Sequence, residues 1–272
     1  EQFKENYRDK VFKTPMETMH DVGFLYSPYA VMLYSITKDE EYKEIALKAA
    51  DALAMRYEPK GRYIRAWGRM DYKIPEYVDS ELAKDHFFTE SAGLAIVDCM
   101  MNIPLLFWAS KVTGHVFYRR IAEMHADTTL KYFIRNDYSV CHAYRFSEET
   151  GEAICEANYC GYTCGSHWAR GTGWAIYGFA IAYNYTGKSE YMDTAMALLD
   201  KFMTECNGKM PVWDFRLPSF EEQALDTSAA AVVLCGIIEI ERHKTNERLK
   251  KYKALLKKLL EEYIDYDENV MG

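Results

Sequence analysis

Two aspartates and one arginine occupy matching places in a pattern that repeats along the chain. Asp21, Asp98 and Arg170 each lie 15 or 16 residues before a threonine that ends an apolar stretch. Equivalent positions in a repeat architecture lie at the same end of the stacked units. The spacing therefore predicts that two carboxyl groups and one guanidinium meet at one rim of the fold.

Asp98 has the sequence surroundings of a general acid. Ile96-Val97 precede it and Cys99-Met100-Met101 follow it. Apolar surroundings raise the pKa of a carboxyl group, and a general acid must hold its proton near the working pH. The alternative is that each aspartate only caps a helix N-terminus. Capping suits Asp226, which precedes Thr227-Ser228, but suits Asp98 poorly.

Other residues near these positions are open to two interpretations. His20 is either a hydrogen-bond donor at the rim or a helix-start residue, and His142 lies in a strand-like stretch where a structural role is the alternative. Trp67 and Trp168 are either stacking platforms for a sugar ring or wall residues. Arg170 lies in an apolar stretch and needs a partner, which a substrate carboxylate or one of the two aspartates could supply.

Three copies of one unit predict the elements that position these residues. Each of Thr37, Thr113 and Thr186 is followed by a tyrosine five residues later and by an alanine nine residues later. An apolar helix is expected before each threonine, at Phe24–Ile36, Ala95–Lys111 and Trp174–Tyr185. An amphipathic outer helix is expected after each one, at Glu41–Arg56, Phe117–Phe133 and Glu190–Thr204.

A short extended return carrying an aromatic residue or a histidine completes each copy, at Tyr63–Trp67, Val140–Tyr144 and Met210–Asp214. Inner helix, outer helix and return, stacked around an axis, predict an all-α (α/α) toroid. A fourth pair at Thr227–Glu239 and Asn246–Tyr263 makes about four hairpins. We therefore expect residues 1–272 to form a single (α/α) barrel that is incomplete at both ends. The segment Met70–Glu90 breaks the pattern and is expected to be a long rim loop.

The composition narrows the classes of partner. The formal net charge is −8 and no run of Lys or Arg stands out, so nucleic acid is not an expected partner. No apolar run is long enough to span a membrane, so no membrane partner is expected either. Aromatic residues make up 15% of the chain, with 22 Tyr and 5 Trp, which suits a carbohydrate cleft as well as barrel packing.

The seven cysteines are scattered and odd in number, which predicts thiols in a reducing cytosol rather than a disulfide framework. Cys160 and Cys164 lie four residues apart, but no second pair completes a zinc site. A thiol nucleophile at Cys160 is a weak alternative, because no further arrangement in the sequence supports it.

Several long motifs, in their order along the chain, resemble glycoside hydrolase family 88, the unsaturated glucuronyl hydrolases. The motifs are His20–Ser27, Ile64–Gly68, Ile96–Leu106, Trp168–Gly171 with Trp174–Phe179, Trp213–Phe215 and Asp226–Ala229. The resemblance implies an (α/α)6 toroid of the six-hairpin glycosidase type that acts as a catalytic domain. It also implies a hydrolase that removes the unsaturated uronic acid from the non-reducing end of lyase-generated glycosaminoglycan oligosaccharides, in the bacterial cytoplasm.

The same resemblance implies roles for individual residues. Asp98 is implied to be the general acid/base and Asp21 its catalytic partner. The implied substrate-binding residues are His20, Trp67, His142, Asn158, Trp168, Arg170 and Trp174. The resemblance implies no metal and no cofactor.

The chain departs from the family pattern at two places. Tyr159-Cys160 stands where the family branch has a His-Gln pair, and the family has further helices at both ends. An unsaturated rhamnogalacturonyl hydrolase and a non-catalytic sugar-binding toroid are the alternative functions. The His20–Phe24 start and Trp213–Phe215 favour the glucuronyl hydrolase, and the presence of both aspartates argues against the non-catalytic alternative.

Overall fold

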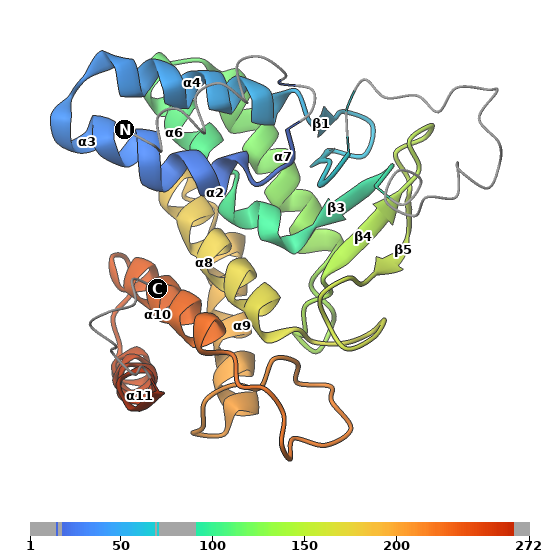
Figure 1. Ribbon diagram of the computed structural model, residues 1–272, viewed down its shortest axis with the longest axis vertical. Helices are drawn as coiled ribbons and strands as arrows, with labels where there is room; N and C mark the ends of the chain where they lie inside the picture. The colour runs from blue at the N-terminus through green and yellow to red at the C-terminus, as the bar shows by residue number, and fades with distance from the viewer. Residues whose placement is uncertain (1–14, 16–17, 69, 71–90, 264–272) are drawn as a thin grey trace, which may run out of the picture. The chain divides into compact units, whose positions relative to one another are not determined.

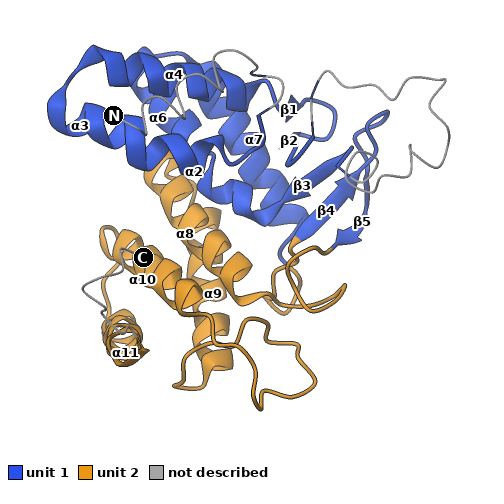
Figure 2. Cartoon of the chain, in the orientation of Figure 1, with its two compact units in different colours: residues 1–134, 143–157 blue, residues 135–142, 158–272 orange. Residues whose placement is uncertain are grey.

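The computed structural model describes residues 15, 18–68, 70 and 91–263 (Figure 1). Helices dominate this part of the chain, and the strands are short. The chain divides into two compact units, which Figure 2 colours separately. Unit 1 comprises Glu1–Ile134 and Ala143–Ala157, and unit 2 comprises Arg135–His142 and Asn158–Gly272.

The described residues of unit 1 form two helical hairpins. In the first, α2 (Val22–Tyr26), the π-helical turn η2 (Ser27–Val31) and α3 (Met32–Thr37) run into one another and are followed by α4 (Glu40–Ala54). The second pairs α6 (Pro104–Thr113) with α7 (Val116–Tyr132). The predicted outer helices of both hairpins are confirmed to within a few residues.

Unit 2 contains the other two hairpins, α8 (Ala169–Thr186) with α9 (Ser189–Cys206) and α10 (Thr227–Glu241) with α11 (Glu247–Tyr263). Helix α8 packs against both α9 and α10 (Figure 1). Gly236 of α10 makes the α8–α10 crossing tight, because a Cβ there would lie 3.1 Å from the Ile176 side chain and 3.3 Å from the Tyr177 backbone. The four predicted hairpins are therefore all found among the described residues.

The repeated threonines close the hairpins in the same way. Each hydroxyl donates to the carbonyl four residues earlier, at 2.7–2.8 Å, and accepts from the N–H two residues later, at 3.1–3.2 Å. The residue after each threonine is left-handed, with φ of 60° at Lys38, 76° at Gly114 and 72° at Gly187. One side chain thus satisfies a carbonyl of the ending helix and a donor before the next helix.

The predicted inner helix Ala95–Lys111 is wrong at its N-terminal end. Leu94–Ile96 is strand β3, and the chain then turns through the 3₁₀ helix η3 (Val97–Met101) before α6 begins. The apolar run is a strand because its backbone pairs with β4 (Ala143–Phe146), Ile96 opposite Ala143. Pro104 lacks an N–H and favours the first helical position, so it starts α6 afresh.

Among the described residues of unit 1, the strands form two small antiparallel sheets. One pairs β1 (Tyr57–Glu58) with β2 (Tyr63–Ile64), and the other has the order β3-β4-β5, with β5 at Ala153–Ala157. Returns predicted at Tyr63–Trp67 and Val140–Tyr144 thus overlap β2 and β4. The return at Met210–Asp214 forms isolated bridges, Trp168 with Asp214 and Val212 with Leu225.

Two predictions fall elsewhere. The expected rim loop Met70–Glu90 lies outside the described residues except for Met70. The single barrel over residues 1–272 stays a prediction. No helix in the described ranges combines the length and apolar character needed to cross a membrane.

Candidate functional site

The two predicted catalytic aspartates come together in unit 1. Asp21 lies directly before α2, and Asp98 lies within η3. The Asn102 side chain hydrogen-bonds the Asp21 carboxyl group and donates to the Asp98 backbone carbonyl at 3.3 Å. Both carboxyl groups also act on Cys99, whose pKa burial raises well above its usual range and their charges raise further. The segments that carry Asp21 and Asp98 therefore contact each other at Asn102, and a shared catalytic site stays a prediction.

The alternative that each aspartate only caps a helix holds for Asp226 but not for Asp21 or Asp98. Asp226 caps α10, because its Oδ1 accepts from the Ala229 N–H at 2.8 Å. Asp21 makes no side-chain cap at α2, and the residue at the cap position of η3 is Ile96 rather than Asp98. Capping therefore explains Asp226 and leaves Asp21 and Asp98 available for chemistry.

Asp98 has the apolar surroundings that its sequence predicts. Val97, Cys99 and Met100 are fully buried, and the Oδ2 atom of Asp98 is itself buried. The apolar neighbours that the sequence predicts for Asp98 are therefore present in the structure.

Asp21 is subject to opposing influences. Burial raises the pKa of its carboxyl group, while the hydrogen bond from Asn102 and the positive charge of Arg56 lower it. The Nε2 atom of His20 lies 3.4 Å from the Asp21 Oδ1, and the backbone N–H of His20 donates to the Ala66 carbonyl at 3.0 Å. His20 therefore links Asp21 to the segment that carries Trp67, whose ring packs on buried Ala66 and its neighbours.

Arg56 is a supporting residue that the sequence analysis missed. It is fully buried and donates to the backbone carbonyls of Arg65 at 2.8 Å, Gly68 at 3.0 Å and Thr18. These bonds hold the chain before His20 against the chain on both sides of Trp67. Burial lowers the pKa of Arg56 to about 10, so it stays cationic at neutral pH. An arginine at the end of an amphipathic helix gives no sign in the sequence of such burial.

His142 and Asn158, both predicted to bind the sugar, hydrogen-bond the loop that follows Asn158. The Nδ1 atom of His142 accepts from the N–H groups of Tyr159 at 2.9 Å and Cys160 at 3.1 Å. Burial lowers the pKa of His142 to about 4, so the ring is neutral at pH 7 and carries its proton on Nε2. The His142 ring also lies edge-on to Trp168, with centroids 5.0 Å apart.

Asn158 has a structural task in this loop. Its Oδ1 accepts from the Gly161 N–H at 2.9 Å, and its Nδ2 donates to the Gly161 carbonyl at 2.6 Å. A binding role for Asn158 stays a prediction. The departure from the family pattern at Tyr159-Cys160 acts here through backbone N–H groups that any residue supplies, so the anchoring of His142 does not require a His-Gln pair.

Asp214 anchors the same loop from the return before α10, and the sequence analysis assigned it no role. Its carboxylate is fully buried and accepts from the N–H groups of Tyr162 at 3.0 Å, His167 at 3.2 Å and Arg216 at 2.8 Å. The Trp213–Phe215 motif was the available signal. Its aspartate holds the loop through backbone N–H groups.

Arg170 lies in the first turn of α8 and is half-buried. Its guanidinium lies over the Trp168 ring at 5.2 Å and donates to the Ser228 Oγ at 3.2 Å. Among the described residues of its unit, it pairs with no carboxylate. Trp174 lies one turn further along α8 and is also half-buried. The expected carboxylate partner of Arg170 is thus not supplied by unit 2 itself, which leaves a substrate carboxylate as a candidate.

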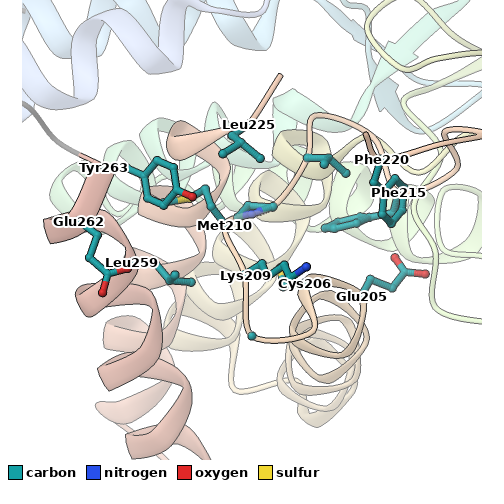
Figure 3. A pocket seen from close by; sticks show the side chains of 13 residues that line it. Glu205, Cys206, Lys209, Met210, Phe215, Phe220, Leu225, Leu259, Glu262 and Tyr263 are labelled. Carbon is teal, nitrogen blue, oxygen red and sulfur yellow. The ribbon is translucent and has the colours of Figure 1, made fainter. Parts of the chain in front are cut away.

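The described residues hold no group of three or more His, Cys, Asp or Glu side chains placed to bind a metal ion. Unit 2 contains a cavity of about 290 Å³ between the end of α9, the segment after it and the end of α11 (Figure 3). Met210, Phe215 and Leu259 are among its lining residues, and none of the predicted site residues lines it.

Comparisons with known proteins identify the family of the chain. The model of Glycosyl Hydrolase Family 88 matches residues 5–262. The chain is 35% identical over 236 residues to the unsaturated glucuronyl hydrolase of Bacillus sp. strain GL1, covering 86% of this chain and 58% of that protein. It is 32% identical over 275 residues to the unsaturated chondroitin disaccharide hydrolase of Streptococcus pyogenes serotype M1, covering 96% of this chain and 63% of that protein. The chain thus spans about three fifths of the length of these relatives.

Solved structures support the fold. The crystal structure of the Bacillus sp. GL1 enzyme superposes with a TM-score of 0.81 at 33% identity, covering 94% of this chain and 64% of that one. An Asp-to-Asn variant of unsaturated glucuronyl hydrolase from Streptococcus agalactiae, in complex with dGlcA-GalNAc6S, gives a TM-score of 0.72 at 27% identity, covering 98% and 62%. These likenesses confirm the predicted fold class, a largely helical (α/α) toroid. With the family model matched over nearly all of its length, the chain belongs to glycosyl hydrolase family 88.

Proposed function

We propose that the protein is a glycoside hydrolase that removes the unsaturated uronic acid from the non-reducing end of lyase-generated glycosaminoglycan oligosaccharides. The observation that carries the proposal is the pairing of Asp21 and Asp98 around Asn102, with neither aspartate used as a helix cap. Family membership and the names of the relatives, which specify unsaturated glucuronyl and unsaturated chondroitin disaccharide substrates, support the substrate class.

The substrate has a C4–C5 double bond that is joined to the ring oxygen, which makes it an enol ether. We assign protonated Asp98 as the acid that delivers a proton to C4. Positive charge then develops at C5 and the ring oxygen, and water adds at C5 while ionised Asp98 accepts the proton of that water. Asp21 orients the water, because its carboxyl group is connected to the Asp98 segment through Asn102.

The product of hydration is a hemiketal, which opens the ring and releases the rest of the glycan. The glycosidic bond is lost without direct attack at C1, so the carboxylate spacing that separates retaining from inverting enzymes does not apply. We assign His20, Trp67, His142, Asn158, Trp168, Arg170 and Trp174 to substrate binding. Arg170 beside Trp168 suits a uronate carboxylate next to a sugar face.

We further propose that the protein works in the bacterial cytoplasm. The seven cysteines form no disulfide, and Cys155, Cys160, Cys164 and Cys235 are exposed. Exposed thiols persist in a reducing compartment. The relatives named above come from bacteria.

The test is an assay of residues 1–272 with an unsaturated chondroitin or hyaluronan disaccharide, followed by loss of the enol-ether absorbance. The saturated disaccharide is the matched control, because it offers the same sugars without the double bond. We expect absorbance loss with the first and no cleavage of the second. Binding without absorbance loss would instead support the non-catalytic toroid, and a preference for unsaturated rhamnogalacturonan disaccharide would support the rhamnogalacturonyl hydrolase.

A further inference from the structure

Asn102 is a fully buried amide at the end of η3 that hydrogen-bonds both α2 and the Asp98 segment. Its Oδ1 accepts from the Phe24 N–H of α2 at 2.7 Å. Its Nδ2 donates to the Asp98 carbonyl at 3.3 Å, and its side chain hydrogen-bonds the Asp21 carboxyl group. The amide oxygen and the amide nitrogen are thus both used, one towards α2 and the other towards η3.

The backbones of the same two segments touch beside this amide. A Cβ at Gly23 would lie 2.3 Å from the Asn102 Cα and 2.5 Å from its carbonyl oxygen, which is a severe clash with backbone atoms. Only glycine therefore allows α2 to approach η3 this closely. The distance between Asp21 and Asp98 is set where their own segments meet, within a few residues of each carboxyl group.

We propose that Asn102 is a positioning residue that fixes the separation and relative orientation of the Asp21 and Asp98 carboxyl groups, with Gly23 providing the close approach. The catalytic meaning of this inference rests on the proposed function. Its structural part, that Asn102 and Gly23 hold α2 close to η3, rests only on the contacts of these two residues.

The chemistry explains why a neutral amide occupies this place. Asp98 must hold a proton and Asp21 must orient water, so a third carboxylate between them would compete for the proton. A lysine would bring a full charge and pull both carboxyl groups towards ionisation. Asn102 donates to Asp21 without adding charge to a site that also contains His20, Arg56 and Cys99.

The first test compares Asn102→Ala with Asn246→Ala in the full chain. Asn246 also uses its side chain on a backbone N–H, that of Leu249 at 2.9 Å, but does so at the start of α11 and far along the chain from both aspartates. We expect Asn102→Ala to lower kcat about a hundredfold with little change in KM, because misplacement by about 1 Å costs that much. Asn246→Ala should lower the urea midpoint and leave kcat unchanged.

The pH profile separates positioning from a merely structural role. The hydrogen bond from Asn102 lowers the pKa of Asp21, so its loss should move the acid limb of the kcat profile to higher pH. A stability defect such as that of Asn246→Ala should not move this limb. Wild-type kcat and an unmoved limb in folded Asn102→Ala would overturn the proposal.

Two variants keep the proposal testable if Asn102→Ala does not fold. Asn102→Asp is nearly isosteric and keeps the acceptor for the Phe24 N–H, so we expect it to fold and to lose most of kcat at neutral pH. Gly23→Ala separates the same segments without removing the amide, and we expect a smaller loss of kcat. Wild-type kcat in both variants would overturn the proposal.

A readout independent of activity distinguishes failure of this inference from failure of the proposed function. Carboxyl ¹³C NMR titration, with Asp21→Asn used for assignment, measures the pKa of Asp21 directly. We expect that pKa to rise in Asn102→Ala, or in Asn102→Asp, whether or not the wild-type chain consumes an unsaturated disaccharide. An unchanged pKa would reject the contact between Asn102 and Asp21, whereas wild-type inactivity with a raised pKa would reject only the proposed function.

Discussion

Asp214 of unit 2 and Asp21 of unit 1 differ in their burial and in the groups that hydrogen-bond them. Asp214 of unit 2 is fully buried and accepts three backbone N–H groups, which tie the loop after Asn158 to the return that carries Trp213. Asp21 of unit 1 keeps two fifths of its side chain exposed and receives its hydrogen bond from the uncharged Asn102 side chain. An aspartate surrounded by backbone donors is committed to holding a loop. An aspartate that keeps contact with solvent and has few donors can exchange a proton.

The largest effect on kcat should come from substituting Asp98, the acid proposed for unit 1. We expect Asp98→Asn to lower kcat by about 10³-fold or more, because general acid–base catalysis contributes about 10²–10⁴-fold. Binding of the unsaturated disaccharide should persist, since the amide has the size of the carboxyl group. Steady-state kinetics and isothermal titration calorimetry measure the two quantities. Retention of a tenth of the wild-type kcat would show that Asp98 is not the acid.

Substituting Asp214 in unit 2 should affect stability and KM more than kcat. Asp214→Ala leaves three N–H groups without their acceptor, and each unsatisfied buried group costs about 1–3 kcal/mol. We therefore expect the free energy of unfolding to fall by about 3 kcal/mol or more in urea denaturation, and KM to rise more than kcat falls. A large loss of kcat with unchanged KM and unchanged stability would contradict the structural role of Asp214.

Arg170 tests whether unit 2 recognises the uronate. We expect Arg170→Ala to raise KM about 10- to 100-fold with a smaller change in kcat, because a charged hydrogen bond contributes about 1.5–3 kcal/mol. The control is Arg242→Ala, since Arg242 is an exposed partner of Glu239. An unchanged KM in Arg170→Ala would mean that the contacts with Trp168 and Ser228 are its whole role.

His142 should make unit 2 sensitive to acid. Its pKa is about 4 in the folded protein and about 6.5 when unfolded, so the unfolded state binds the proton first as pH falls. Stability is therefore complete above pH 6.5 and decreases as pH falls towards 4, by about 2 kcal/mol at pH 5. His142→Gln should flatten this part of the stability curve. An equal slope in the variant would show that other groups cause the acid loss.

The smallest expected effect is a gain of stability in unit 1. Burial raises the pKa of Asp21, so the folded state holds that proton more readily than the unfolded state, and stability falls as pH rises through the two pKa values. Asp21→Asn removes this penalty and should raise Tm slightly at pH 7, with no difference at pH 3. The gain is small because water screens the exposed part of the side chain. A lower Tm at pH 7 would show that the carboxylate stabilises the fold.

Local patterns in the sequence were sufficient for the hairpins. The threonine spacing predicted them because each threonine makes its bonds within four residues of itself. The start of the inner helix at Ala95 was wrong because β3 depends on a partner strand nearly fifty residues later. Asn102 and Asp214 were missed as supports for the same reason, since they act on Phe24 and Tyr162, 78 and 52 residues away.

Gly68 and Ser91, which lie between the Asp21 and Asp98 segments in the sequence, are close to each other in the structure. The Nε atom of Arg65 donates to the carbonyls of Trp67 and Ser91, both at 3.1 Å, and a Cβ at Gly68 would lie 2.5 Å from the Ser91 Oγ. Polypeptide inserted between Gly68 and Ser91 therefore begins from ends that are already joined, and doubling its length adds only about 0.6 kcal/mol of closure entropy. The approach of α2 to η3 at Gly23 and Asn102 therefore does not depend on the length of the chain between Gly68 and Ser91.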